Sequence, residues 1–244
     1  MEAVENDSAV AASDTGSDAD TSPPAPTRDD TAAAGGDSFD ADTGVRQEDE
    51  PAPPPVDPAV LVGRTYAFDL STSTIAAPAG MGSVLAGWLE NELVVQVLAV
   101  DSRRMDLRWG WTEPGGSAQD MCMPTTDASA DFTGNPRFET APSGGSLRVI
   151  APMNTESAVL SGTIAHEGRR VEHARLTMLA EVTPLAAEFG LESGAELCDL
   201  FGSMGSACEP CADGSATCLR FSFEEVTGEP VSAAPLVGVE TGCE

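Results

Sequence analysis

Lysine is absent from this sequence, and its twelve basic side chains are all arginines. A P-loop needs a lysine at the nucleotide phosphates, and protein kinases and enzymes that form Schiff bases need one as well. The sequence therefore excludes these three classes. It also lacks any hydrophobic run of the ~20 residues that a membrane-spanning helix needs, so no transmembrane segment is predicted.

Positive charge is scarce throughout. Forty acidic residues stand against twelve arginines, and the formal net charge is −28 at pH 7. Proteins that bind nucleic acid neutralise its phosphates with Lys and Arg, and anionic membrane surfaces attract the same side chains. We therefore expect neither nucleic acid nor an anionic membrane surface as a partner.

Large apolar residues are nearly missing from residues 1–58, where fifteen acids face only Arg28 and Arg46. This composition cannot bury enough apolar surface to offset the entropy lost on ordering, so it predicts a disordered acidic tail. The end of the tail, PAPPPVDP (51–58), favours an extended, polyproline-like spacer. Residues 59–244 hold all six cysteines and all three tryptophans, which predicts one domain with a sizeable core.

The segment RRMDLRWGWT (103–112) has the two-residue period of a strand with one buried face. We predict that it forms a hairpin with LVVQVLAVD (93–101), turning at Asp101–Ser102. Arg104 and Arg108 are expected to face solvent. The opposite, buried face carries Met105, Leu107, Trp109 and Trp111.

Further patterns complete the expected fold. Strands are predicted at 63–70, 146–151, 157–165, 170–182 and 217–226. Apolar stripes predict two short helices, one over 81–89 and one that starts at Ser193, whose spacing to Glu196 is that of a capping box. Residues 113–145, rich in Pro, Gly, Ser and Asp, are predicted as loops. Seven strands with clear alternation favour a mainly β fold, as an antiparallel sheet, sandwich or barrel with two short helices.

The stretch CDLFGSMGSACEPCADGSATC (198–218) contains four of the six cysteines, and three interpretations compete for it. A structural zinc site usually takes two C-x2-C pairs, but only Cys208 and Cys211 have that spacing. A thioredoxin-like centre needs its C-x-x-C at a helix N-terminus, but turn residues follow this one. Disulfides are the third interpretation.

Disulfides fit best, because the number of cysteines is even and they cluster in Gly-rich segments with little to pack. We predict bridges among Cys122, Cys198, Cys208, Cys211, Cys218 and Cys243. Either Cys208–Cys218 or Cys211–Cys218 brackets the ADGSA turn, and the other pairings stay open. Cys243 would hold the C-terminal end in place. No metal or cofactor is predicted.

Disulfides persist in oxidising compartments, so they predict an extracytoplasmic location in the periplasm, at the outer membrane or on the cell surface. The chain does not open with a basic n-region and an apolar h-region. We therefore expect a leader upstream of Met1, and an acidic tail ahead of a folded domain is how a lipid-anchored lipoprotein would begin.

The domain resembles a family of uncharacterised predicted lipoproteins from myxobacteria and their relatives. The resemblance rests on TYAFDLSTSTIAAPAGMGSVL (65–85), on QDMC and ADFTGNPRFE within 119–139, on LSGTIAHEG (160–168) and on the cysteine-rich stretch, and it covers most of residues 63–220. It implies an extracytoplasmic, lipid-anchored protein and brings no catalytic residue with it. The lipobox expected of such a protein is absent from this chain.

Both histidines lie around one predicted turn, in HEGRRVEH (166–173). The spacing is not H-E-x-x-H, because His173 comes seven residues after His166 and not four. Across a hairpin the two rings, with Glu167 and Glu172, could still form a metal site. The alternative is a pair of exposed histidines on an acidic surface, and we favour it.

We predict a non-enzymatic interaction or structural domain of the cell envelope or a secreted one, with an unknown partner and no catalytic residue. One alternative is a barrel-like module that binds a lipid or another apolar ligand against Trp109 and Trp111. A second alternative is an envelope hydrolase, because forty carboxylates make some close pair certain. An open apolar interior would favour the ligand binder, and a filled interior the interaction domain.

Overall fold

The computed structural model describes residues 53–240, so most of the predicted tail (1–58) and Cys243 lie outside it. The predicted domain boundary at residue 59 comes too late. Val56 is buried in the core, and the side-chain amide of Asn135 both donates to its carbonyl (2.8 Å) and accepts from its N–H (2.9 Å). The end of the Pro-rich segment therefore belongs to the folded domain.

Ten strands form the framework of the described chain. They are β1 (Thr65–Phe68), β2 (Thr74–Ala77), β3 (Leu93–Val100), β4 (Arg104–Trp111), β5 (Thr126–Asp131), β6 (Arg137–Thr140), β7 (Ser143–Arg148), β8 (Pro152–Ala165), β9 (Arg170–Glu181) and β10 (Cys218–Pro230). The helical elements are short. They are α1 (Gly82–Ala86), α2 (Thr183–Ala186), α3 (Gly194–Ser203) and the single turns η1 (Pro58–Val60), η2 (Leu70–Thr72), η3 (His166–Gly168) and η4 (Ala187–Phe189).

The antiparallel fold is confirmed, and of the three predicted architectures it is the barrel. Eight strands pair in the order β1-β3-β4-β5-β6-β8-β9-β10, and β10 pairs with β1 to close the ring. β2 extends the sheet beyond the ring by pairing with β10, and β7 pairs with β8. The predicted hairpin of β3 and β4 is confirmed, with Leu93 opposite Trp111. Closure leaves this ring without free strand edges.

The prediction of loops over residues 113–145 is wrong, because β5, β6 and the start of β7 lie there. β5 (TDASAD) has none of the aromatic and few of the β-branched residues by which strands are usually recognised. Its inward side chains are only Ala128 and Ala130. Hydrogen bonding to β4 along the whole strand holds it in the barrel, and a single sequence does not display that tertiary contact.

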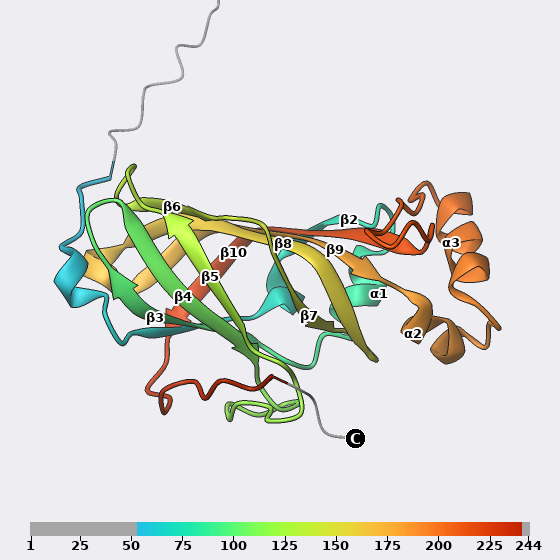
Figure 1. Ribbon diagram of the computed structural model, residues 1–244, viewed down its shortest axis with the longest axis horizontal. Helices are drawn as coiled ribbons and strands as arrows, with labels where there is room; N and C mark the ends of the chain where they lie inside the picture. Colours follow the sequence, from blue (N-terminus) through green and yellow to red (C-terminus); the bar gives the residue numbers. More distant parts are fainter. Residues whose placement is uncertain (1–52, 241–244) are drawn as a thin grey trace, which may run out of the picture. The chain divides into compact units, whose positions relative to one another are not determined.

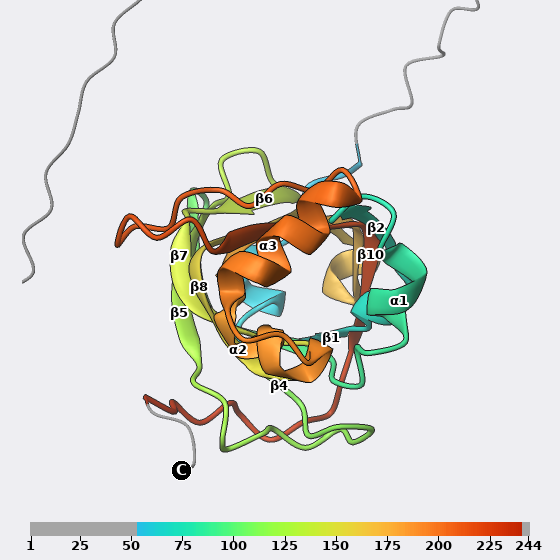
Figure 2. The same cartoon turned by 90° about the vertical axis from the view of Figure 1, so that its right-hand side faces the viewer.

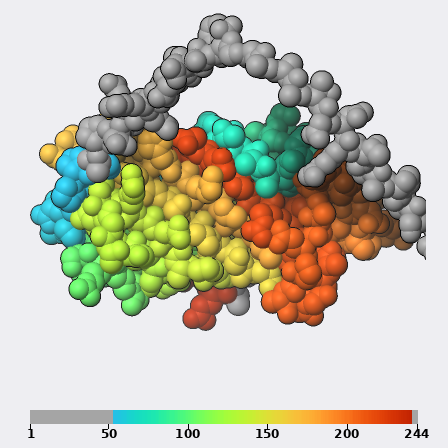
Figure 3. Space-filling view, turned by 90° about the horizontal axis from the view of Figure 1, so that it is seen from above, coloured from blue at the N-terminus to red at the C-terminus, as the bar shows by residue number. Residues whose placement is uncertain are grey.

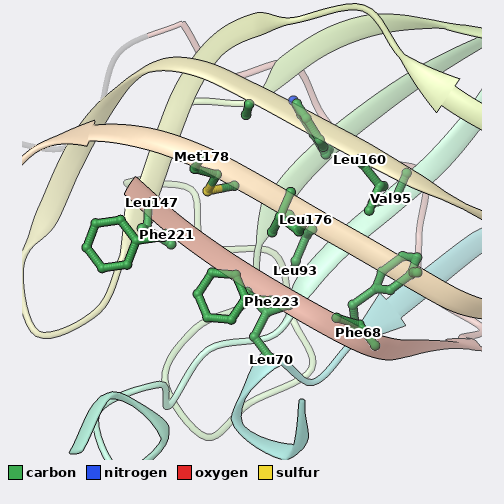
Figure 4. Packing of buried hydrophobic residues seen from close by; sticks show 14 of the residues in the cluster. Phe68, Leu70, Leu93, Val95, Leu147, Leu160, Leu176, Met178, Phe221 and Phe223 are labelled. Atoms are coloured by element: carbon green, nitrogen blue, oxygen red, sulfur yellow. The ribbon is translucent and has the colours of Figure 1, made fainter. Parts of the chain in front are cut away.

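The interior of the barrel is filled by the inward side chains of its strands (Figure 4). Phe221 and Phe223 of β10, Leu176 and Met178 of β9, and Leu160 of β8 point into one core, and all five are at most 2% exposed. Fully burying such side chains contributes roughly 1.5–3 kcal/mol each. The alternation predicted for these strands thus directs one continuous apolar cluster inward.

Both ends of the barrel are covered. Helices α1, α2 and α3 gather at one end, and η1 lies at the other (Figure 1). Figure 2 looks onto the helical end, where α2 and α3 lie across the opening of the ring of strands. Leu185 of α2 and Leu197 and Phe201 of α3 are buried there. At the opposite end the fully buried Leu61 follows η1.

The predicted second helix is confirmed as α3. The Ser193 side chain accepts a hydrogen bond from the backbone N–H of Glu196, as a capping box requires. The Glu196 carboxylate accepts from the N–H of Glu192, one residue beyond the cap position. Gly205, at φ +91°, follows the last turn in the left-handed conformation that glycine adopts most readily. α2 was not predicted, because a single turn carries no periodic signal.

Residues 231–240 run along the outer surface of the barrel over β3. Leu236 packs on Ala67 and Val94, and its N–H donates to the buried side chain of Gln96 (3.0 Å). The carbonyl of Val239 accepts from the N–H of Thr125 (2.8 Å). The segment thus joins the 113–125 loop to the barrel wall.

Candidate functional site

Trp109 and Trp111 lie on the inner face of β4, 4% and 2% exposed. The indole N–H of Trp111 donates to the backbone carbonyl of Ser146 on β7 (2.9 Å). The cavity that the two rings line measures about 10 Å³, which is room for one water molecule. As the barrel stands, these residues are core, and no lipid fits beside them.

The opposite face of β4 carries ion pairs. Arg108 makes two hydrogen bonds to Asp127 of β5 (2.7 and 2.8 Å), and Arg104 pairs with its own strand neighbour Asp106 (2.7 Å). The Arg108 guanidinium lowers the pKa of Asp127. Arg108 also reaches the carbonyl of Leu236 (3.4 Å). The predicted solvated face is therefore an ordered cross-strand contact that also holds residues 231–240.

The two histidines do not form a metal site with each other. His166 Nε2 lies 3.2 Å from the Glu172 carboxylate, and His173 Nδ1 lies 3.0 Å from that of Glu225. Within residues 53–240, no histidine belongs to any group of three potential ligands close enough to share an ion. The geometry thus favours the alternative of two exposed histidines, each beside a glutamate.

The backbone at these pairs is unusual. Among the described residues, non-glycine positions with positive φ are His166, Glu167, His173 and Glu225. Such a conformation costs roughly 1–2 kcal/mol per residue. His173 and Glu225 lie where the β9–β10 register shifts, so a bulge accounts for them. His166 and Glu167 form the tip of the β8–β9 hairpin.

A buried hydrogen bond holds that hairpin tip. The hydroxyl of Tyr66, the only tyrosine of the chain, donates to the carbonyl of Gly168 (2.6 Å). Gly168 itself has φ +82°, and a Cβ there would lie 2.6 Å from the side chain of Leu61. Close packing therefore requires glycine at this position. Burial raises the pKa of Tyr66 to about 12, and nearby Arg64 opposes the shift.

The raised pKa of Tyr66 predicts a loss of stability in alkali. Its stabilising contribution is complete below pH 10, the pKa in the unfolded chain, and is lost as the pH rises towards 12. The loss should reach about 2–3 kcal/mol. Urea titrations at several pH values above 9 should show this decline, and Tyr66→Phe should lack it. A parallel decline in both proteins would contradict the prediction.

β9 and β10 also form a row of cross-strand ion pairs. Arg170 pairs with Glu229, and Arg175 pairs with Glu224 (2.6 Å). Their side chains are between one third and three fifths exposed, so each pair contributes under about 1 kcal/mol. The row stabilises the pairing of the two strands, and its four charges compensate one another.

A surface cleft of about 690 Å³ separates the Pro53–Asp57 segment from the β8–β9 hairpin tip. Its volume is in the range of ligand sites. Among its charged side chains, Glu172 lies beside His166 and Glu167 beside Arg169. Asp57 and Arg64 hydrogen-bond to nearby backbone. The cleft therefore favours no particular ligand chemistry. Sequence reasoning missed it, because the segment was assigned to the spacer.

The disulfide interpretation is confirmed for four cysteines. Cys198 is bonded to Cys208, and Cys211 to Cys218, with Cα separations of 5.5 and 5.3 Å. Of the two pairings predicted around the ADGSA turn, Cys211–Cys218 is the one found. Cys122 is also disulfide-bonded, and Cys243 lies outside the described chain. A zinc site would need free thiolates, but these four sulfurs form two disulfides. A thioredoxin-like centre would join the two cysteines of its C-x-x-C to each other, whereas Cys208 and Cys211 are bonded to different partners.

One group of potential metal ligands remains within the described chain. Glu156, Cys211 and Cys218 place their ligand atoms within 4.8 Å of one another. The two sulfurs form the disulfide, and the Glu156 carboxylate accepts from the N–H of Ala212 (2.9 Å). These groups therefore hold the turn at Ala212 against β8.

Both of these disulfides lie at the helical end of the barrel. Residues 182–217, which connect β9 to β10, are called the helical cap below. Cys198–Cys208 joins α3 to the following loop, and Cys211–Cys218 joins that loop to the start of β10. Phe189 packs edge-on against Trp88 and Phe201, at ring-centroid distances of 5.3 and 6.2 Å. The cap is thus fixed to the barrel by covalent bonds and aromatic packing.

Comparison with family models, curated proteins and solved structures finds no match to this chain. The resemblance to predicted lipoproteins therefore stays a prediction. No helix of residues 53–240 has the length and apolar character needed to cross a membrane.

Proposed function

We propose that this protein is a non-enzymatic interaction domain that works outside the cytoplasm and binds its partner through the outer surface of the barrel. The observation that carries the proposal is the filled interior. Trp109 and Trp111, the residues best suited to an apolar ligand, border a cavity of about 10 Å³, whereas ligand pockets usually measure 300–1,000 Å³. A barrel without internal room offers its outer surface for recognition.

The extracytoplasmic part of the proposal is supported by the disulfides. Two of them close short loops in the helical cap, and such bonds are rare in reducing compartments. A lipid anchor upstream of Met1 and membership of the predicted lipoprotein family would agree with this location. Both remain predictions.

Native mass spectrometry of freshly isolated full-length protein tests the proposal. We expect the disulfides to be formed and no lipid or metal to be retained non-covalently. A fluorescent fatty-acid analogue should show no saturable binding. Alkylation without reductant should leave the five cysteines of residues 53–240 unmodified, because their sulfurs are already bonded.

Two results would contradict the proposal in different ways. A retained apolar molecule, released on replacement of Trp109 or Trp111, would establish the ligand-binding alternative. Free thiols in freshly isolated protein would remove the argument for an oxidising compartment. Trp88→Phe serves as the matched control for the tryptophan variants, because Trp88 contacts Phe189 of the helical cap and does not line the small cavity.

A further inference from the structure

The outer face of α3 exposes apolar side chains on a rigid element. Leu200 of α3 and Met204, the residue that caps the C-terminal end of α3, are 39% and 40% exposed. They lie four residues apart, which is about one helical turn. The inner face of the same helix buries Leu197 and Phe201. The exposed pair is therefore additional to the face that packs on the barrel.

The charged residues of the helical cap itself all have one sign. The helical cap contains no Lys or Arg, and its acids are Glu188, Glu192, Glu196, Asp199, Glu209 and Asp213. All ten arginines of residues 53–240 lie elsewhere in the sequence. Within the described chain, Glu209 is the one cap carboxylate with an ion-pair partner, Arg220 (2.7 Å). Glu196 and Asp199 directly flank the exposed pair on α3.

The location of the cap makes this surface accessible. In the space-filling view the residues of the cap, orange to red, form one end of the domain, and the residues around η1, in blue, form the other (Figure 3). Cys198 of α3 is bonded to Cys208, which fixes the helix relative to the loop after it. Rigid elements lose less entropy on binding than mobile ones.

We infer that the outer face of α3 docks a basic, amphipathic protein segment. The apolar side chains of that segment would cover Leu200 and Met204, and its Lys or Arg side chains would pair with Glu196 and Asp199. Charge complementarity selects this class of partner, because an acidic segment would be repelled by a cap with six carboxylates. The inference rests on the proposed function and names the surface through which the domain acts.

The test measures binding of two synthetic peptides to the full-length protein by fluorescence anisotropy. One peptide carries lysine and leucine in heptad spacing, and the other has serine in place of each leucine. We expect the leucine peptide to bind more tightly. Replacing both Leu200 and Met204 by serine should weaken it about tenfold and leave the affinity for the serine peptide unchanged.

Matched variants separate a specific site from general attraction. Val62→Ser removes an exposed apolar side chain near η1 and should change neither affinity. Glu196→Gln with Asp199→Asn should reduce the salt dependence of binding more than Glu90→Gln with Glu113→Gln, which removes the same charge from loops outside the cap. Every variant retains residues 1–58, so their charge contributes equally.

The inference would be overturned if the cap variants and the control variants lost equal affinity for the leucine peptide. It would also be overturned if the wild-type protein bound neither peptide. Neither result would contradict the proposed function, because that proposal does not specify which outer surface binds the partner. It is contradicted by an apolar ligand retained inside the barrel. Loss of binding to both peptides in the Leu200 and Met204 variant, accompanied by a lower melting temperature, would show that the pair is structural and would also reject the inference.

Discussion

Replacing Cys198, Cys208, Cys211 and Cys218 together by alanine is expected to lower the free energy of unfolding by about 5 kcal/mol. The bonded cysteines are 10 and 7 residues apart in sequence. Closing loops of this size removes entropy from the unfolded chain equivalent to about 2.5–3 kcal/mol for each bridge. Typical domains have only 5–15 kcal/mol of stability, so the loss is a large part of the total.

The loss should be concentrated in the helical cap. α2 has four residues and α3 ten, and helices this short are not stable by themselves in water. Without the bridges, they keep only the packing of residues such as Leu197 and Phe201 against the barrel. We therefore expect amide protons of α3 to exchange much faster with solvent, whereas those of β9 and β10 inside the barrel stay protected.

Urea denaturation and hydrogen exchange of the wild type and of each two-cysteine variant check this prediction. The variants are more informative than reductant, because reductant would also break the disulfide of Cys122. A change below 1 kcal/mol with unaltered exchange at α3 would mean that apolar packing alone holds the cap. If amide protons of β4 also exchanged faster in the cysteine variants, cap and barrel would unfold as one unit.

The sequence predicted those elements whose side chains alternate strongly. β4, with Met105, Leu107 and Trp109 on one face, and its hairpin with β3 are as expected. β5 and the first residues of β7 were missed, because their Ala, Ser and Gly residues give no pattern. Closure of the barrel was also beyond sequence reasoning, since it depends on pairing between β1 and β10, more than 150 residues apart in the chain.

Candidate sites were harder to predict than strands. The ADGSA turn indicated a local bridge to Cys218 from either Cys208 or Cys211, and the structure has the bridge from Cys211. The surface on α3 was not recognised, although Leu200 and Met204 lie in the segment predicted as a helix from Ser193 onward. A periodic pattern does not reveal which apolar residues face the core, and only the position of α3 on the barrel separates Phe201 from Leu200.

Trp111→Ala is expected to lower the free energy of unfolding by about 3–5 kcal/mol. The ring is 2% exposed, and its N–H donates to the carbonyl of Ser146. Its removal would leave a large cavity beside Leu93, which faces it across the β3–β4 pair. Trp111→Phe retains most of the apolar contact and should cost less, about 1–3 kcal/mol, mainly through the unsatisfied carbonyl.

The same experiment separates a core residue from a ligand contact. If Trp111 existed to hold an apolar ligand, the apoprotein would tolerate alanine with little change in urea midpoint, and the variant would lose only binding. If the barrel interior is filled by side chains, the Trp111→Ala protein should be less stable than the wild type even though neither protein carries a ligand. A Trp111→Ala protein within 1 kcal/mol of the wild type would show that the interior adjusts readily, and recognition inside the barrel would then become the better explanation of Trp109 and Trp111.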